Sequence, residues 1–165
     1  MKQRISYTIW GIEKDSSNWI NWYFDVQQLF ASFGYDLTHI GITSGTFQSN
    51  KILTVSRNEK KLLKAIQGGE IPHCIECYSL KSDYKIAMFD YKILCIRSDF
   101  YITTVINDSD LTENKEHKIL ELEKKYFNIE KGEVYYTSDK EVPMIYADTK
   151  DSGNLETYKF IKNIS

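Results

Sequence analysis

Residues 19–33 constrain the fold most, because their apolar side chains repeat at the spacing of an α-helix. The repeat comprises Trp19, Trp22, Tyr23, Val26, Leu29, Phe30 and Phe33. At about 100° per residue, these positions cover an arc of roughly 120°, the width of a stripe that faces a core. Five of the seven side chains are aromatic, and burial of each stabilises a fold by about 1.5–3 kcal/mol. We therefore predict an amphipathic helix whose aromatic side packs on a sheet.

Polar residues and glycine bound this predicted helix. Ser17 can be its N-cap, because a serine hydroxyl accepts a hydrogen bond from a free amide of the first turn. Gly34 can end it, since glycine adopts the left-handed conformation without steric cost. Ile20 and Phe24 lie one turn apart and outside the stripe. We expect another element to cover them; the alternative is that they form part of a partner surface.

The first half of the chain otherwise alternates between strand and helix patterns. Residues 4–12 and 37–42 read as strands on either side of the aromatic helix, which indicates a possible βαβ unit. Residues 43–50 form a polar loop with one aromatic side chain, Phe47, that we expect to be exposed. Ser56 and Glu59 have the spacing of a capping box for a helix that extends to about residue 67.

The second half is rich in β-strand patterns. Residues 74–80, 84–89, 92–97 and 100–106 predict an antiparallel meander, with turns at residues 81–83 and 98–99. Thr112 can cap a surface helix over residues 113–127. Residues 134–137 and 144–147 are short strand candidates, and residues 155–164 fit either a strand or a closing helix. The pattern predicts an α+β fold in which an antiparallel sheet is packed by the aromatic helix and two further helices, within a single domain over residues 1–165.

Composition limits the classes of function. The formal net charge of −2 gives no indication of nucleic-acid binding. Residues 84–165 carry 12 basic and 15 acidic side chains, a net charge of −3 that we attribute to the solvation of an ordinary surface; the alternative is that it suits a basic partner. No apolar run approaches the length of a membrane span, and residues 1–7 lack a signal-peptide core. We expect a cytoplasmic protein with no membrane association, no cofactor and three reduced cysteines.

The sequence Cys74-Ile-Glu-Cys77, preceded by His73, is the single motif match. Residues i and i+3 of a regular strand point to opposite faces, so the two thiols cannot share a metal or a disulfide without a bulge. A zinc site would also need two more ligands. The interpretation favoured here is that both are buried small apolar residues; a redox or metal role for Cys74 and Cys77 stays open.

Elimination favours a non-catalytic binding protein. A compact, aromatic-rich domain without a recognisable reaction motif suits a bacterial immunity protein that neutralises a cognate toxin by masking it. Masking needs exposed carboxylates and aromatic anchors rather than catalytic groups. The candidate partner surface comprises Phe47, Asp108, Asp110, Glu113, Glu116, Asp148 and Asp151.

Two other classes of function fit the same sequence. One is a small hydrolase or transferase that uses His39 or Cys74 in an unrecognised cleft. The other is a small-ligand sensor with an apolar cavity under the meander. The sequence does not specify the partner or the oligomeric state.

Overall fold

The described part of the chain forms one eight-stranded sheet, in the order β3-β2-β4-β5-β6-β1-β7-β8, in which every neighbouring pair is antiparallel. A computed structural model describes residues 2–48 and 51–165. The strands are β1 (Gln3–Glu13), β2 (His39–Thr43), β3 (Ile52–Thr54), β4 (Cys74–Leu80), β5 (Tyr91–Ser98), β6 (Tyr101–Asn107), β7 (Phe127–Ser138) and β8 (Lys159–Asn163). The helices are α1 (Trp19–Ser32), α2 (Val55–Gln67), α3 (Glu113–Tyr126) and α4 (Met144–Thr149), with 3₁₀ turns η1 (Asp108–Asp110) and η2 (Ser152–Asn154). The α+β prediction is confirmed.

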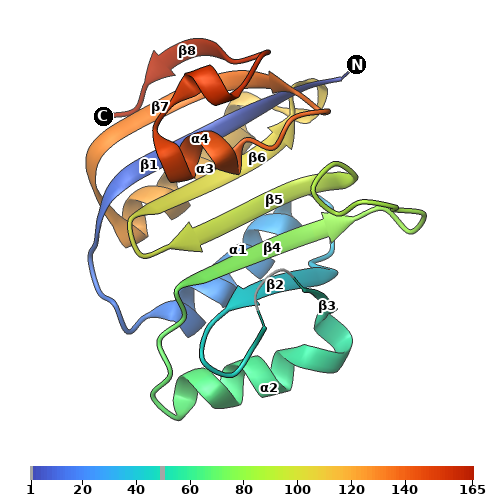
Figure 1. The fold of residues 1–165 in the computed structure, drawn as a ribbon, viewed down its shortest axis with the longest axis vertical. Coiled ribbons are helices and arrows are strands. Elements are labelled where there is room, and N and C mark those ends of the chain that lie inside the picture. The colour runs from blue at the N-terminus through green and yellow to red at the C-terminus, as the bar shows by residue number, and fades with distance from the viewer. Residues whose placement is uncertain (1, 49–50) are drawn as a thin grey trace.

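Helices cover the two faces of the sheet unequally (Figure 1). α1 and α3 lie behind the sheet in this view, and the short α4 lies in front of it. The pairing order gives β1 and β2 the same direction, but β4, β5 and β6 lie between them. The predicted strand–helix–strand order is therefore present, with α1 crossing three intervening strands.

Two adjacent rows of paired residues show how the faces differ. One row, on the face covered by α1 and α3, runs Leu53, Ile40, Cys77, Cys95, Thr104, Tyr7 and Val134. The next, on the opposite face, runs Ile52, Gly41, Glu76, Ile96, Thr103, Thr8 and Glu133. Directly paired residues project to the same side of a sheet, so each row belongs to one face. We call the second face, which carries α4, the open face.

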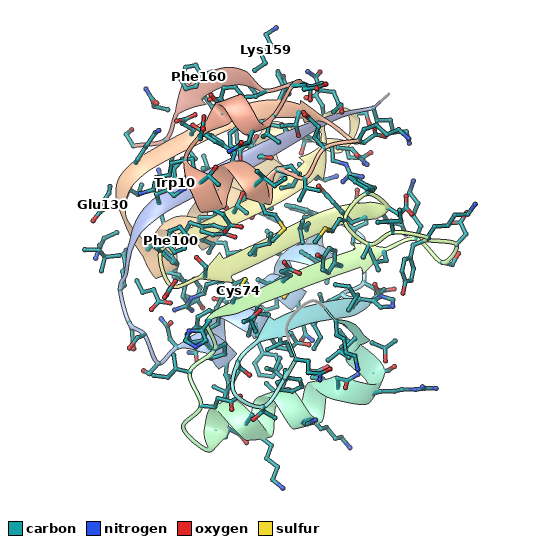
Figure 2. All side chains as sticks on the ribbon, viewed as in Figure 1. Trp10, Cys74, Phe100, Glu130, Lys159 and Phe160 are labelled. Carbon is teal, nitrogen blue, oxygen red and sulfur yellow. The ribbon has the colours of Figure 1, made fainter. Side chains whose placement is uncertain are left out.

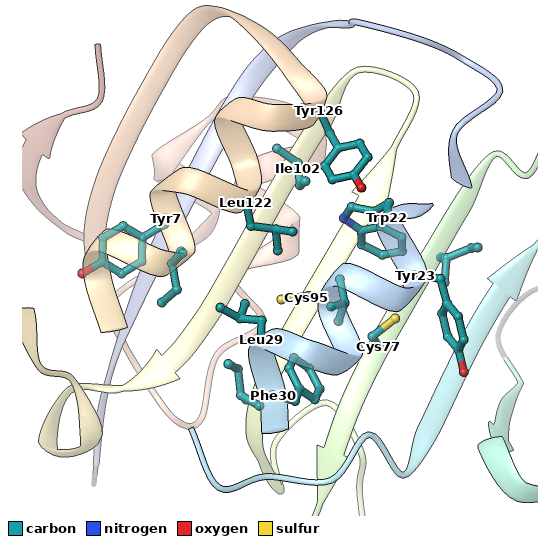
Figure 3. Packing of buried hydrophobic residues seen from close by; sticks show 14 of the residues in the cluster. Tyr7, Trp22, Tyr23, Leu29, Phe30, Cys77, Cys95, Ile102, Leu122 and Tyr126 are labelled. Carbon is teal, nitrogen blue, oxygen red and sulfur yellow. The ribbon is translucent and has the colours of Figure 1, made fainter. Parts of the chain in front are cut away.

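The aromatic stripe of α1 packs on the sheet as predicted. Its buried residues are Trp19, Trp22, Tyr23, Val26, Leu29 and Phe30. Figure 3 shows Trp22, Leu29 and Phe30 turned toward the sheet residues Cys77 and Cys95. Leu122 and Tyr126 of α3 complete the same core.

Three details at α1 differ from or refine the prediction. Phe24 is 40% exposed, so the expectation that another element covers it is wrong, whereas Ile20 is half-buried. Ser17 is not the cap: Asn18 holds that position without a side-chain bond, and the Ser17 hydroxyl donates to Asp15 Oδ1. Gly34 has φ +82°, as expected of a residue that ends a helix.

The predicted capping box before α2 is wrong. β3 runs straight into α2, so Thr54 is the N-cap and makes no side-chain cap bond. Glu59 instead accepts a hydrogen bond from Gln27 of α1. Phe47, predicted to be exposed, is buried in the helix-side core, where Lys61 Nζ lies 5.0 Å from its ring centre. Ser49 and Asn50, the end of the predicted polar loop, lie outside the described residues.

Residues 84–89, predicted as a strand, belong to a turn-rich connection between β4 and β5. The Asp90 carboxylate accepts hydrogen bonds from the amides of Lys85 and Ile86 at 2.8 and 2.9 Å. The amides of Phe89 and Asp90 both donate to the Ile86 carbonyl. These local bonds use the backbone groups that a strand would offer to its neighbours.

The C-terminal third contains longer elements than predicted. Thr112 caps α3 as expected, accepting from the Lys115 amide at 3.2 Å. β7 then follows α3 directly and is 12 residues long. Residues 144–147, predicted as a strand, belong to helix α4. The last segment forms the outer strand β8, on which Lys159 and Phe160 lie (Figure 2).

Candidate functional site

The open face has two separate covers, and α4 is the first. The Trp10 indole donates to the Ala147 carbonyl at 2.8 Å, which fixes the helix to β1. The Tyr146 hydroxyl lies 2.8 and 3.0 Å from the two oxygens of Glu133 on β7. Tyr158 donates to the same carboxylate at 2.6 Å. These bonds fill the part of the face over β1 and β7 and leave the face over β2 and β4 free of α4.

The second cover is the connection between β4 and β5, residues 81–90, which we call the 81–90 loop. Arg4 of β1 donates to the carbonyls of Phe89 and Tyr91 at 2.5 and 3.2 Å. The Arg4 guanidinium carbon also lies 3.6 Å from the Tyr91 ring centre. Because Arg4 is itself buried, this end of the loop is held by the sheet.

The tip of the 81–90 loop presents apolar side chains to solvent. Ile86 is 55% exposed, and Tyr84 and Met88 are each 37% exposed. The ring of Tyr84 packs edge-on against His39, with 5.0 Å between ring centres. Exposed apolar side chains that gather at one place on a surface are typical of protein interfaces.

A pocket of about 260 Å³ separates the 81–90 loop from β2 and β3. Its lining is formed by Gly41, Ile42, Thr43, Lys51, Ile52, Glu76, Ile86, Ala87 and Met88. Gly41 pairs directly with Glu76 in the sheet. A Cβ atom at Gly41 would lie 2.6 Å from Glu76 Oε2, so the missing side chain leaves room for this carboxyl group.

The Glu76 carboxyl group is the charged centre of the pocket. Tyr78 donates a hydrogen bond to its Oε2 at 2.9 Å. Burial raises the pKa of Glu76, the nearby Asp148 carboxylate raises it further, and the Tyr78 hydrogen bond opposes the rise. Within residues 2–48 and 51–165, no cationic side chain lies at ion-pair distance from Glu76. The pocket therefore combines apolar walls with an unpaired acidic group.

Cys74 lies on the open face near this pocket, at the start of β4 (Figure 2). Cys77 lies on the other face, in the helix-side core, so the strand separates the two thiols as predicted. Burial raises the pKa of the Cys74 thiol, and the carboxylates of Glu76, Asp148 and Asp99 add to the rise. A nucleophilic cysteine needs the opposite shift.

His39 lines a separate hollow of about 330 Å³ with Asp36, Ser82 and Tyr84. Its Nδ1 lies 2.9 Å from the Thr38 hydroxyl, the one hydrogen bond of the ring among the described residues. Burial lowers the pKa of His39. The neutral form is therefore favoured at neutral pH, and the ring contacts Thr38 and Tyr84 rather than a nucleophile.

The predicted partner residues are not brought together into one surface. Phe47 is buried near α2, while Asp108, Asp110 and Glu113 lie at η1 and the start of α3. Glu116 accepts hydrogen bonds from Tyr7 and Lys162.

Asp148 and Asp151 lie at and just after α4, on the open face. Asp151 caps η2 by accepting from the Gly153 amide. Asp148 is exposed, yet the protein atoms around its carboxyl raise its pKa, and the Tyr101 hydroxyl opposes that rise. Among the predicted partner residues, Asp148 is the one that raises the pKa of Glu76.

The residues that form the pocket, Gly41, Glu76, Ile86 and Met88, were not among the sequence candidates. Strand alternation over residues 74–80 does place Glu76 and Tyr78 on one face, so the acidic residue could have been noticed. The pairing of Gly41 with Glu76 spans 35 positions and has no local signal.

Among residues 2–48 and 51–165, no three His, Cys, Asp or Glu side chains gather as a metal site would require. The helices of this part of the chain all lack the length and apolar character of a membrane span. A further hollow of about 330 Å³ lies between α1 and α3, lined by residues that include the Asp25–Lys125 ion pair.

Comparison with protein-family models, with curated proteins and with solved structures finds no significant match to this chain.

Proposed function

We propose that this chain is a non-catalytic protein-binding protein that masks a partner through the open face. The observation that carries the proposal is the 81–90 loop, whose backbone is held by Arg4 and Asp90 and which exposes Tyr84, Ile86 and Met88 at the surface. Interface energy concentrates in a few apolar anchors surrounded by polar groups. The specific proposal is a bacterial immunity protein that acts in the cytoplasm and neutralises a cognate toxin domain.

The acidic group of the pocket guides the choice of partner. Glu76 lies in the pocket and Asp148 lies close enough to affect its pKa, while Lys51 of the lining and Lys81 and Lys85 of the 81–90 loop are basic. We propose that a basic group of the partner meets Glu76 and that the helix-covered side of the sheet stays out of the contact. Asp108, Asp110 and Glu113 lie at η1 and at the start of α3, which covers the other face of the sheet, so we propose the open face in preference to the α3 end for the contact.

The test uses the protein encoded by the neighbouring reading frame, since immunity genes sit beside their toxins. Titration calorimetry should give a dissociation constant in the micromolar range or below with the full chain. Ile86→Asp should weaken binding at least about tenfold, because a buried unpaired charge costs several kcal/mol. Phe160→Asp is the matched control, since Phe160 is similarly exposed at 48% but lies on β8. No binding, or equal loss from both variants, would contradict the proposal.

A small-ligand sensor is the second candidate, because the pocket of about 260 Å³ is only slightly smaller than the roughly 300–1,000 Å³ typical of ligand sites. In that case the chain would bind a small molecule in the absence of any protein. Thermal-shift screening of a metabolite library against the chain and Glu76→Gln separates the two candidates. A ligand that raises the melting temperature of the chain and not of the variant would favour the sensor.

A further inference from the structure

We infer that the pocket beside the 81–90 loop receives a single basic side chain, lysine or arginine, from the protein partner, with Glu76 as its counter-ion. This inference rests on the proposed function and specifies its chemistry. The pocket supplies both parts that such a side chain requires: a carboxyl group at the floor and apolar walls for the methylene stem.

The floor is built by the register of β2 against β4. Gly41 and Glu76 are direct partners, and the absence of a side chain at Gly41 leaves the carboxyl group over the sheet backbone. The Tyr78 hydroxyl donates a hydrogen bond to Oε2. Oε1 accepts no hydrogen bond among the described residues, yet it is not fully buried. The Glu76 side chain therefore keeps an accessible acceptor on the pocket.

The walls are apolar and come from two elements. Ile52 of β3 lies on one side, and Ile86 and Met88 of the 81–90 loop lie on the other. Lysine and arginine place their methylene groups on apolar surface while the charged end finds a polar partner. Lys51, also in the lining, is exposed and lies beyond ion-pair distance of Glu76.

Electrostatics favours a cation over a neutral group. A half-buried carboxylate such as that of Glu76, without a cationic partner, is more costly to ionise than one in water. Its pKa is raised, and among the described residues the one charge that shifts it, Asp148, is also negative. An incoming ammonium or guanidinium group would pair with Glu76 and lower its pKa again.

The first experiment uses N-acetylarginine amide and N-acetyllysine amide as probes, with N-acetylnorleucine amide as the neutral analogue. Methyl NMR of the full chain should show saturable shifts at Ile52, Ile86 and Met88 with the two basic probes. The Glu76 carboxyl pKa, read from its ¹³C shift, should fall when either probe is present. Shifts of equal size with the neutral analogue, or shifts absent at these residues, would overturn the inference.

Variants locate the effect at Glu76. Glu76→Gln keeps the shape of the side chain and should weaken binding of the basic probes at least about tenfold. Gly41→Ala should also weaken them, because the new Cβ displaces the carboxyl group. Glu130→Gln is the matched control: Glu130 is exposed on β7, away from the pocket (Figure 2), so binding should stay within about twofold.

The same variants separate this inference from the proposed function. If the neighbouring protein binds and Ile86→Asp weakens it while Glu76→Gln does not, protein masking stands and the basic-anchor inference fails. If Glu76→Gln weakens the neighbouring protein at least tenfold and the Glu130→Gln control does not, both stand. If the neighbouring protein does not bind, the proposed function fails. The inference that this partner inserts a basic side chain then fails as well, even if the amide probes bind.

Discussion

The guanidinium carbon of Arg97 lies 4.2 Å from the centre of the Trp19 ring, at the point where α1 begins. Its Nη2 is 3.2 Å from Glu13 Oε1 and 3.1 Å from the Asp15 carbonyl. Arg97 is fully buried on β5, so one side chain connects the middle of the sheet to the turn between β1 and α1. This contact orients the first turn of the helix on which the core depends.

The first prediction concerns this ion pair. Burial lowers the pKa of Arg97 and raises the pKa of Glu13, and in each case the partner's charge only opposes the shift. Desolvation thus outweighs the attraction. Arg97→Met should lower the free energy of unfolding by about 1–3 kcal/mol, because the half-buried Glu13 carboxylate and the Asp15 carbonyl lose their shared donor. Urea denaturation measures the change.

Its control is the double variant Arg97→Met with Glu13→Leu. Removing both charges should recover most of the lost free energy, because neither desolvation cost remains. A double variant no more stable than Arg97→Met would show that the packing of the guanidinium on Trp19, rather than the buried charge, causes the loss.

The second prediction compares two aromatic residues of α1. Trp22 is fully buried and Phe24 is 40% exposed, although only two positions separate them. Trp22→Ala should cost about 3–5 kcal/mol of unfolding free energy, since it leaves a cavity in the core. Phe24→Ala should cost less than about 1 kcal/mol. Equal costs would contradict the orientation of the helix.

The third prediction is a pH dependence that comes from Glu123. This residue is fully buried, its Oε2 accepts from the Thr104 hydroxyl at 3.0 Å, and burial raises its pKa well above the ordinary 4.5. A raised folded-state pKa contributes stability below pH 4.5 that is lost as the pH rises through the folded value.

The measurement is the free energy of unfolding of the chain and of Glu123→Gln across pH 4 to 8. The free energy of unfolding of the wild type minus that of the variant should fall as the pH rises, with a limiting slope of about 1.4 kcal/mol per pH unit for one proton. Other carboxyl groups titrate equally in both proteins and cancel. A difference that stays constant across this range would exclude Glu123 as the source.

The fourth prediction concerns the irregularity between β1 and β7 at Trp10 and Gly11. A Cβ atom at Gly11 would lie 1.9 Å from the Asn128 carbonyl oxygen, which is backbone and cannot rotate away. Gly11→Ala should therefore destabilise the chain by about 1–3 kcal/mol. Gly68→Ala, where the nearest atoms are 3.4 Å away, should change thermal stability far less. Comparable melting temperatures for both variants would be the opposite result.

Local periodicity predicted the helices that bury a stripe. α1 and α3 repeat apolar residues every three or four positions, and their burial follows from that pattern alone. Strand-like sequence patterns likewise predicted the strands of the meander, but residues 84–89, which carry the same kind of pattern, do not form a strand. There the Asp90 carboxylate and Arg4, which is 85 positions from Phe89, impose turns on a sequence with strand propensity.

Long-range contacts decided the rest. Residues 144–147 are apolar enough for a strand, yet Trp10, 137 positions away, holds them as a helix on the open face. Phe47 stands in a polar stretch but is covered by α2. The pocket depends on the register of β2 against β4, which no neighbouring residue encodes. Local sequence patterns therefore predicted most of the helix-side core, whereas the pocket and the burial of Phe47 depend on contacts between distant residues.

Hydrogen–deuterium exchange of the full chain, with and without the neighbouring reading frame's protein, tests the proposed binding face most directly. The account predicts slower exchange on binding for amides of the 81–90 loop and of β2, with little change in α1 and α3. Protection centred instead on α1, α3 or η1, with the 81–90 loop unaffected, would contradict it.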